Sequence, residues 1–275
     1  MTSTGFDVAH FTRHPHDLRR SSGDLPIALP QSTLRALSYL WSIERTALDR
    51  LRELLVTPAH SDSRLTAFLI TWSFEQHQLS ERLRDILVAH DLPPRAPTPT
   101  GAGRLRRVWD ERGAAPVGAF RSNVLGADLA AAALAHSWLD TTATALLHES
   151  LGATEPGLAE LSVGVCAVKA RHREFFTTEV AAALTTSGVG AHSEECRGVA
   201  RARRYTRRAL SQWRWPGTRY AGTLPAHVAV GHLLEERSFH VAAAAAEVQF
   251  GTLIGAPGVR TLTRERNRIL GKRFR

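Results

Sequence analysis

Two stretches early in the chain repeat apolar residues at alternating intervals of three and four, the spacing of a single buried face on an α-helix. The first comprises Leu34, Leu37, Trp41, Glu44, Leu48, Leu51 and Leu55, and the second comprises Leu65, Phe68, Trp72, Glu75, Leu79, Leu83 and Ile86. Each stripe contains one polar residue, Glu44 or Glu75, at the end of a Trp-Ser-x-Glu tetrapeptide. A carboxylate on an apolar face needs a partner, so these glutamates are the first candidates for a functional site.

The same kind of pattern predicts helices along most of the chain. Helices over about 31–56 and 63–90 are joined by a short turn and must therefore lie antiparallel. Several prolines and glycines interrupt the next segment, and two further helices follow, over about 118–151 and from Pro156 to about 185. We therefore predict two antiparallel hairpins joined by a long crossover, and no strand, because no segment has the two-residue period of one.

This pattern divides the chain into three parts. Residues 1–30 lack periodicity and are expected to form a flexible N-terminal arm. Residues 31–187 form the two hairpins. Residues 188–275 are expected to be a helical extension packed on them, with helices over about 193–213, 225–254 and 259–270. The predicted fold class is all-α.

Composition narrows the class of protein further. With 275 residues, of which 43% are hydrophobic, the chain can build a large core. We expect a soluble, cytoplasmic protein, because no apolar run reaches the roughly 18 residues of a membrane span and the start lacks the apolar region of a signal peptide. Phosphate-loop, Gly-x-Ser-x-Gly and Cys-x-x-Cys motifs are missing, which disfavours nucleotide-dependent enzymes and serine hydrolases.

The layout resembles the ferritin-like superfamily of di-iron carboxylate proteins over residues 31 to about 185. In that family two helices each supply one Glu, and the other two each supply a Glu-x-x-His pair. Glu44 matches the lone glutamate of the first helix. Glu75 matches the glutamate of the pair on the second helix, but Gln78 stands where the histidine is expected. His77 cannot replace that histidine, because two residues rotate a side chain by about 200° around a helix.

On the other two helices the resemblance is also partial. Asp140 occupies the carboxylate position of the third helix, and it follows Trp138 much as the two glutamates follow their tryptophans. On the fourth helix His172 is present, but Lys169 replaces the glutamate. An ammonium group there would repel a second cation and attract the carboxylates.

Three alternatives remain open for this site. The first is a complete di-iron centre. The second is a single ion, iron or manganese, bound by Glu44, Glu75, Asp140 and His172, and one ion is favoured over two. The third is a metal-free network in which Lys169 supplies the missing positive charge. Lys169 and Gln78 are the altered positions and the candidate catalytic residues, since a buried, paired lysine can also act as a general acid or base.

Two further clusters stand in the C-terminal part. His232, Glu236 and His240 recur at intervals of four, with Glu247 near the same face, so they could hold a metal ion or form a solvated polar stripe. The segment 197–219 has eight arginines and no acidic residue. Its stripe of Arg197, Arg201, Arg204 and Arg208 could bind an anionic partner, although the chain has no motif that reads nucleic acid.

The resemblance implies an iron- or manganese-dependent oxidoreductase, namely a small-molecule oxidase or oxygenase, or a descendant with an altered metal site. The alternative is a non-catalytic, metal-free binding or scaffold protein that recognises an anionic partner through the arginine stripe. A small-molecule substrate fits the first function. Nothing in the pattern decides between a monomer and a homodimer.

Overall fold

The computed structural model describes residues 5–18, 28–55, 62–94, 127–185 and 226–254, together with seven single positions, 206, 210, 260, 263, 264, 267 and 268. In these residues the regular structure is entirely helical, as predicted. The helices are α1 (Val8–Arg13), α3 (Gln31–Glu44), α4 (Ala47–Leu55), α5 (Ser63–Ala89), α8 (Ala127–Thr154), α9 (Ala159–Thr185), α11 (Ala226–Ala229), α12 (Gly231–Leu234) and α13 (Arg237–Ile254), with a 3-10 turn η2 (Pro156–Leu158). None of the described helices has the length and apolar character needed to cross a bilayer.

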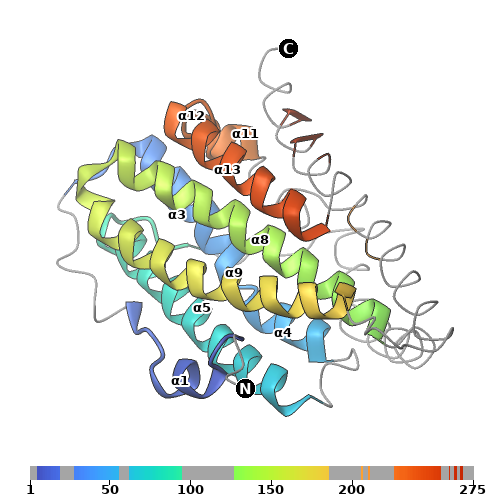
Figure 1. The fold of residues 1–275 in the computed structure, drawn as a ribbon. Coiled ribbons are helices and arrows are strands. Elements are labelled where there is room, and N and C mark those ends of the chain that lie inside the picture. Colours follow the sequence, from blue (N-terminus) through green and yellow to red (C-terminus); the bar gives the residue numbers. More distant parts are fainter. Residues whose placement is uncertain are drawn as a thin grey trace, which may run out of the picture.

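The longest helices pack around a common apolar core (Figure 1). The helix α5 contacts α3 and α4 and also lies against α9, while α8 packs along α9. The helices α11, α12 and α13 cover the outside of α3 and α8. All seven members of the second stripe are buried, including Glu75, which confirms the face predicted for α5.

The pair formed by α8 and α9 is antiparallel. The indole nitrogen of Trp138 donates a hydrogen bond to Thr177 Oγ1 at 2.9 Å, away from the turn that joins the two helices. At the other end, next to η2, Gly152 lies so close to Ser162 that any side chain at position 152 would overlap it. The absent side chain of Gly152 thus allows the two backbones to approach where the chain reverses.

The helix predicted over 31–56 is interrupted at Arg45 and Thr46. The Thr46 hydroxyl donates to the carbonyl of Ile43 at 2.6 Å, and the Thr46 amide bonds to the same carbonyl at 3.1 Å. A hydroxyl that bonds back to a preceding carbonyl competes with the regular helical hydrogen bond and bends the helix. The interruption rotates the following face, so Leu48 is 52% exposed while Ala47 and Leu54 are buried. The first stripe is therefore correct through Glu44 and wrong at Leu48.

The helix predicted over 225–254 is three helices instead. The break after α12 is stabilised by Ser150 of α8, whose hydroxyl donates to the Leu233 carbonyl at 3.0 Å. Because of the breaks, the positions of His232, Glu236 and His240 do not share one continuous helix. His232 is half-buried, whereas Glu236 and His240 are exposed. The predicted helices over 193–213 and 259–270, and the crossover between α5 and α8, lie almost wholly outside the described residues.

Part of the segment expected to be a flexible arm has a defined place. Residues 5–18 include the short helix α1, which begins after Asp7, whose carboxylate accepts from the His10 amide at 2.9 Å. Val8, Phe11 and Leu18 are buried, and α1 lies against α5 (Figure 1). Burial of these three apolar residues fixes the segment against the core. They are too few to form a periodic pattern, so the sequence did not indicate their burial.

Candidate functional site

Glu44, the last residue of α3, forms a buried ion pair with Lys169 of α9. The side chain of Lys169 is fully buried, and its Nζ lies 2.8 Å from Glu44 Oε1. Lys169 also donates a hydrogen bond to the amide oxygen of Gln76 on α5, at 3.3 Å. One ammonium group thus connects three helices in the middle of the core.

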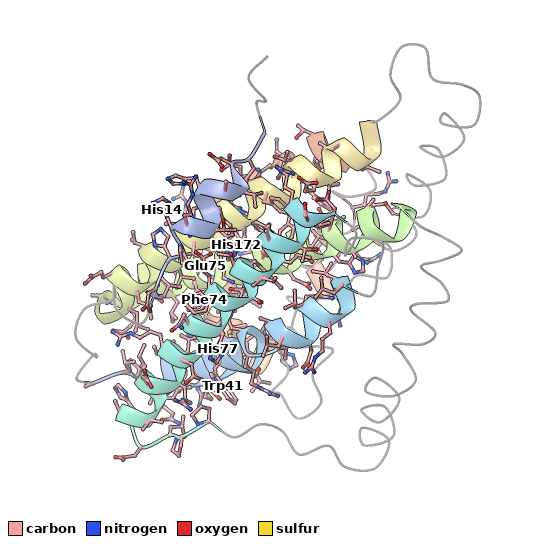
Figure 2. All side chains as sticks on the ribbon, turned by 90° about the horizontal axis from the view of Figure 1, so that it is seen from below. His14, Trp41, Phe74, Glu75, His77 and His172 are labelled. Atoms are coloured by element: carbon pink, nitrogen blue, oxygen red, sulfur yellow. The ribbon has the colours of Figure 1, made fainter. Side chains whose placement is uncertain are left out.

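Glu75 of α5 has a separate set of partners, and its side chain is fully buried as well. Its Oε2 lies 2.6 Å from Nε2 of His172, and its Oε1 accepts from the guanidinium of Arg171 and from the backbone N–H of His16 at 2.7 Å. Figure 2 labels both residues, Glu75 on α5 and His172 on α9. Both carboxylate oxygens are therefore engaged.

The helix α9 supplies the positive charge for both carboxylates. Lys169 and His172 are three residues apart, so they lie on nearly the same side of α9, one turn from each other. Lys169 pairs with Glu44, while Arg171 reaches Glu75 from a position that is one quarter exposed. Two buried negative charges thus meet two positive charges, as burial requires.

Two buried histidines complete the site. His148 of α8 has its Nε2 3.8 Å from Glu44 Oε1, and neither ring nitrogen hydrogen-bonds to any described residue. Burial lowers the pKa of His148, and Glu44 only partly offsets this effect. Burial likewise lowers the pKa of His172, against the opposing effect of Glu75. Both imidazoles are therefore held neutral near pH 7.

The ionisation of Glu44 reflects two opposing effects. Burial raises the pKa of its carboxyl, but the charge of Lys169, assisted by His148, outweighs burial and lowers the pKa to about 2. Glu44 is therefore ionised at neutral and mildly acidic pH. The pair with Lys169 is a true ion pair.

The structure brings together only some of the predicted site residues. Glu44, Lys169, Glu75 and His172 lie in the core as expected. Asp140 is instead about one quarter exposed and forms an ion pair with Arg50, where α4 meets α8. The interruption after Glu44 directs Arg50 toward α8, and no sequence pattern indicated this.

The glutamine beside Lys169 is Gln76, whereas Gln78 is half-buried further along α5. Both Glu75 and Gln76 are buried because α5 packs against α3 on one side and α9 on the other. His77 is exposed, which agrees with the rotation expected from helical geometry (Figure 2).

Four groups at the site were not found from the sequence. These are Gln76, His148, Arg171 and the backbone N–H of His16. His148 lies in an apolar stretch of α8. A polar residue in such a stretch could have indicated from the sequence that it belongs to the site. The N–H of His16 carries no sequence signal, because every residue except proline has one.

The side chains at this site are of types that bind metal ions, but their contacts in this structure do not fit a bound metal. Two carboxylates and two imidazoles, one from each of α3, α5, α8 and α9, are the ligand types that iron and manganese accept. However, the Lys169 ammonium lies against Glu44, and three donors occupy Glu75. Over the described residues, no three His, Cys, Asp or Glu side chains are grouped so that they could hold an ion.

Replacing Lys169 with methionine should strongly destabilise the protein. Glu44 would lose the charge that offsets its burial, and breaking a buried pair from one side costs about 3–5 kcal/mol in the free energy of unfolding. The double variant Lys169→Met with Glu44→Gln removes both charges and should recover most of that loss. Urea unfolding of the two variants and the wild type measures this; a loss of well under 1 kcal/mol in the single variant would contradict the pairing.

The pair should also produce a defined acid dependence. The pKa of Glu44 is about 2 in the folded protein against an ordinary value of 4.5 for a glutamate, so the unfolded state binds more protons between these values. Stability from this group is therefore complete above pH 4.5 and is lost as pH falls toward 2, by about 3 kcal/mol in total. The stability of the wild type minus that of Glu44→Gln, followed by urea unfolding from pH 6 downward, should decline over this interval; a constant difference would show that Glu44 is not stabilised by its partners.

Comparison with known proteins found no matching family model, no similar curated protein and no similar solved structure.

Proposed function

We propose that this protein is a ferritin-like four-helix bundle that works without a metal ion, as a binding or scaffold protein. The observation that carries the proposal is the fully buried Lys169, whose Nζ lies 2.8 Å from Glu44. Under the resemblance to di-iron proteins, position 169 is that of a glutamate ligand. The ammonium group therefore supplies positive charge where the family would use a metal.

Electrostatics supports this substitution. A divalent cation a few ångströms from Lys169 would be repelled, and the low dielectric of the core strengthens this repulsion. The Nζ of Lys169 also has two oxygen partners already, the Glu44 carboxylate at 2.8 Å and the Gln76 amide oxygen at 3.3 Å. A metal ion that binds Glu44 would have to displace Lys169, which already neutralises the charge of this carboxylate.

A network of this kind stabilises one arrangement of helices over others. The Lys169 side chain connects α9 to both α3 and α5, and a shift of α9 by one residue would separate buried charges. In this proposal the core serves as a rigid frame, and binding takes place on its surface. The stripe of Arg197, Arg201, Arg204 and Arg208 is the proposed contact for an anionic partner, and all four residues lie outside the described part of the chain.

A second candidate function is the metal-dependent oxidase or oxygenase. The histidines favour it, since His148 has both ring nitrogens unpaired among the described residues and His172 has its Nδ1 unpaired. Neutral imidazoles without hydrogen bonds in a buried site are unusual, and metal ligation is one way to satisfy them. Iron or manganese would supply dioxygen chemistry beside a small-molecule substrate.

Metal analysis distinguishes the two candidates. Protein expressed in medium supplemented with iron, and separately with manganese, should contain far less than one ion per chain. Its thermal midpoint should not change when either metal is added, because a ligand that binds only the folded state must raise it. Stoichiometric metal that is lost in Glu75→Ala would instead establish a metal site at Glu75 and favour the oxidase or oxygenase.

The anionic partner can be probed with heparin. Replacing Arg201, Arg204 and Arg208 with glutamine should lower the salt concentration at which the protein elutes from a heparin column, because each lost contact to an anion reduces counterion release. The same three residues changed to lysine form the matched control and should elute close to the wild type. Unchanged elution of the glutamine variant would remove the basis for this partner.

A further inference from the structure

We propose that residues 5–18 form a latch that closes over the Glu75–His172 pair and opens independently of the helical core. The latch would control access to these two groups from solvent. This inference goes beyond the proposed function and does not depend on it. It rests on aromatic contacts, on polar contacts and on the small size of the segment.

Aromatic side chains of the latch cover the site directly. Phe11 is 2% exposed, its ring stacks on Phe68 at 4.9 Å, and it meets the His172 ring edge-on at 6.0 Å. Phe6 contacts Phe68 at 5.8 Å and Phe175 at 5.4 Å. These rings lie between solvent and the aromatic wall of α5 and α9.

Polar contacts join the latch to the same carboxylate. The His16 N–H donates to Glu75 Oε1 at 2.7 Å. Arg171 donates to the His14 carbonyl at 3.2 Å and also to Glu75, while its guanidinium lies over the Phe11 ring at 4.9 Å. In Figure 2 His14 stands near the Glu75 and His172 labels. Arg171 thus contacts the buried carboxylate and the segment that covers it.

The far end of the latch is seated on α9. Leu18 is 1% exposed, and its Cδ2 lies 3.4 Å from where a side-chain carbon at Gly164 would stand. The small residue at position 164 therefore leaves room for Leu18. The latch has an anchor at each end, Phe6 and Leu18, with Phe11 and His16 between them over the site.

The latch has few means of holding its own structure. The helix α1 has six residues, and an isolated helix of that length is not stable in water. In contrast, α5 and α9 have 27 residues each and pack on several helices. A segment held by a few buried side chains and by hydrogen bonds to groups on other elements is expected to open at a lower free energy than the core does.

Opening would change the site without unfolding it. Glu75 would lose one of its three donors, the His16 N–H, but would keep Arg171 and His172. The His172 ring would lose the cover of Phe11. The lost hydrogen bond and aromatic burial favour the closed state at rest, so the latch is expected to be closed most of the time.

Hydrogen exchange on the full-length wild type tests independent opening without any variant. Amides of residues 10–16 that are hydrogen-bonded, above all the His16 amide, should exchange at least about 100-fold faster than amides of α5 near Glu75, because sub-global opening precedes global unfolding. Equal exchange rates for the His16 amide and these α5 amides would mean that the segment opens only when the core unfolds, and would overturn the proposal.

Chemical labelling of His172 tests whether the latch controls access. Diethyl pyrocarbonate modifies accessible imidazoles, and exposed His77 on α5 serves as the internal reference. In full-length Phe11→Ala, the labelling of His172 relative to His77 should rise about tenfold or more, since a large aromatic anchor is removed from the latch. The readout is the modified fraction of each histidine by mass spectrometry.

The matched control is Phe250→Ala, which removes an equally buried ring stacked on Trp138 at 4.6 Å, where α13 meets α8. The two variants are compared at temperatures equally far below their unfolding midpoints. His172 should remain protected in Phe250→Ala. Equal labelling in the two variants, whether low or high, would show that Phe11 does not specifically protect His172 and would overturn the proposal.

Discussion

The contact between Glu44 and Lys169 constrains the rest of the core, because neither charge can be buried without the other. It places the end of α3 against the middle of α9 and, through Gln76, places α5 beside both. Once α9 is held in this register, His172 one turn further along is positioned against Glu75. The interruption of the first predicted helix follows directly after Glu44. The helical path is therefore broken next to the residue whose charge Lys169 neutralises. Three helices, α3, α5 and α9, are thereby related through a few polar atoms inside an apolar core.

The two halves of this network differ in how they meet solvent. Around Glu44 every partner is fully buried, and the pKa of the carboxyl is lowered to about 2 although burial alone would raise it. Around Glu75 one donor, Arg171, is partly exposed, and another, the His16 backbone, belongs to the N-terminal segment. Burial lowers the pKa of both His148 and His172, so neither adds charge near neutral pH. The first half is therefore closed off from solvent on the side of each of these partners, whereas the environment of the second can change if the segment above it moves.

Sequence periodicity was sufficient for features that depend on one helix at a time. The bounds of α5, the burial of its seven-residue stripe and the outward position of His77 all follow from 3.6 residues per turn. Contacts between elements were harder to predict. The pair of Asp140 with Arg50 depends on the bend that the Thr46 hydroxyl introduces, and the role of Gln76 depends on α5 being buried on two sides. The place of residues 5–18 depends on a surface that exists only after α5 and α9 have packed together.

If position 169 is that of a metal ligand, as the ferritin-like resemblance implies, the lysine there changes what the helical core can do. A metal ion can exchange ligands and bind a substrate molecule directly, because its coordination sphere can open. The ammonium of Lys169 has three protons and no acceptor capacity, and it is already ion-paired with Glu44 and donates a hydrogen bond to Gln76. Chemistry at this point would first have to break an ion pair in a low-dielectric environment, which costs several kcal/mol. The pair of Glu75 and His172 differs in its cover, which is the short segment 5–18 and not a helix of the core. Movement of this segment would therefore change the surroundings of Glu75 and His172, while the contacts of Glu44 and Lys169 continue to connect α3, α5 and α9.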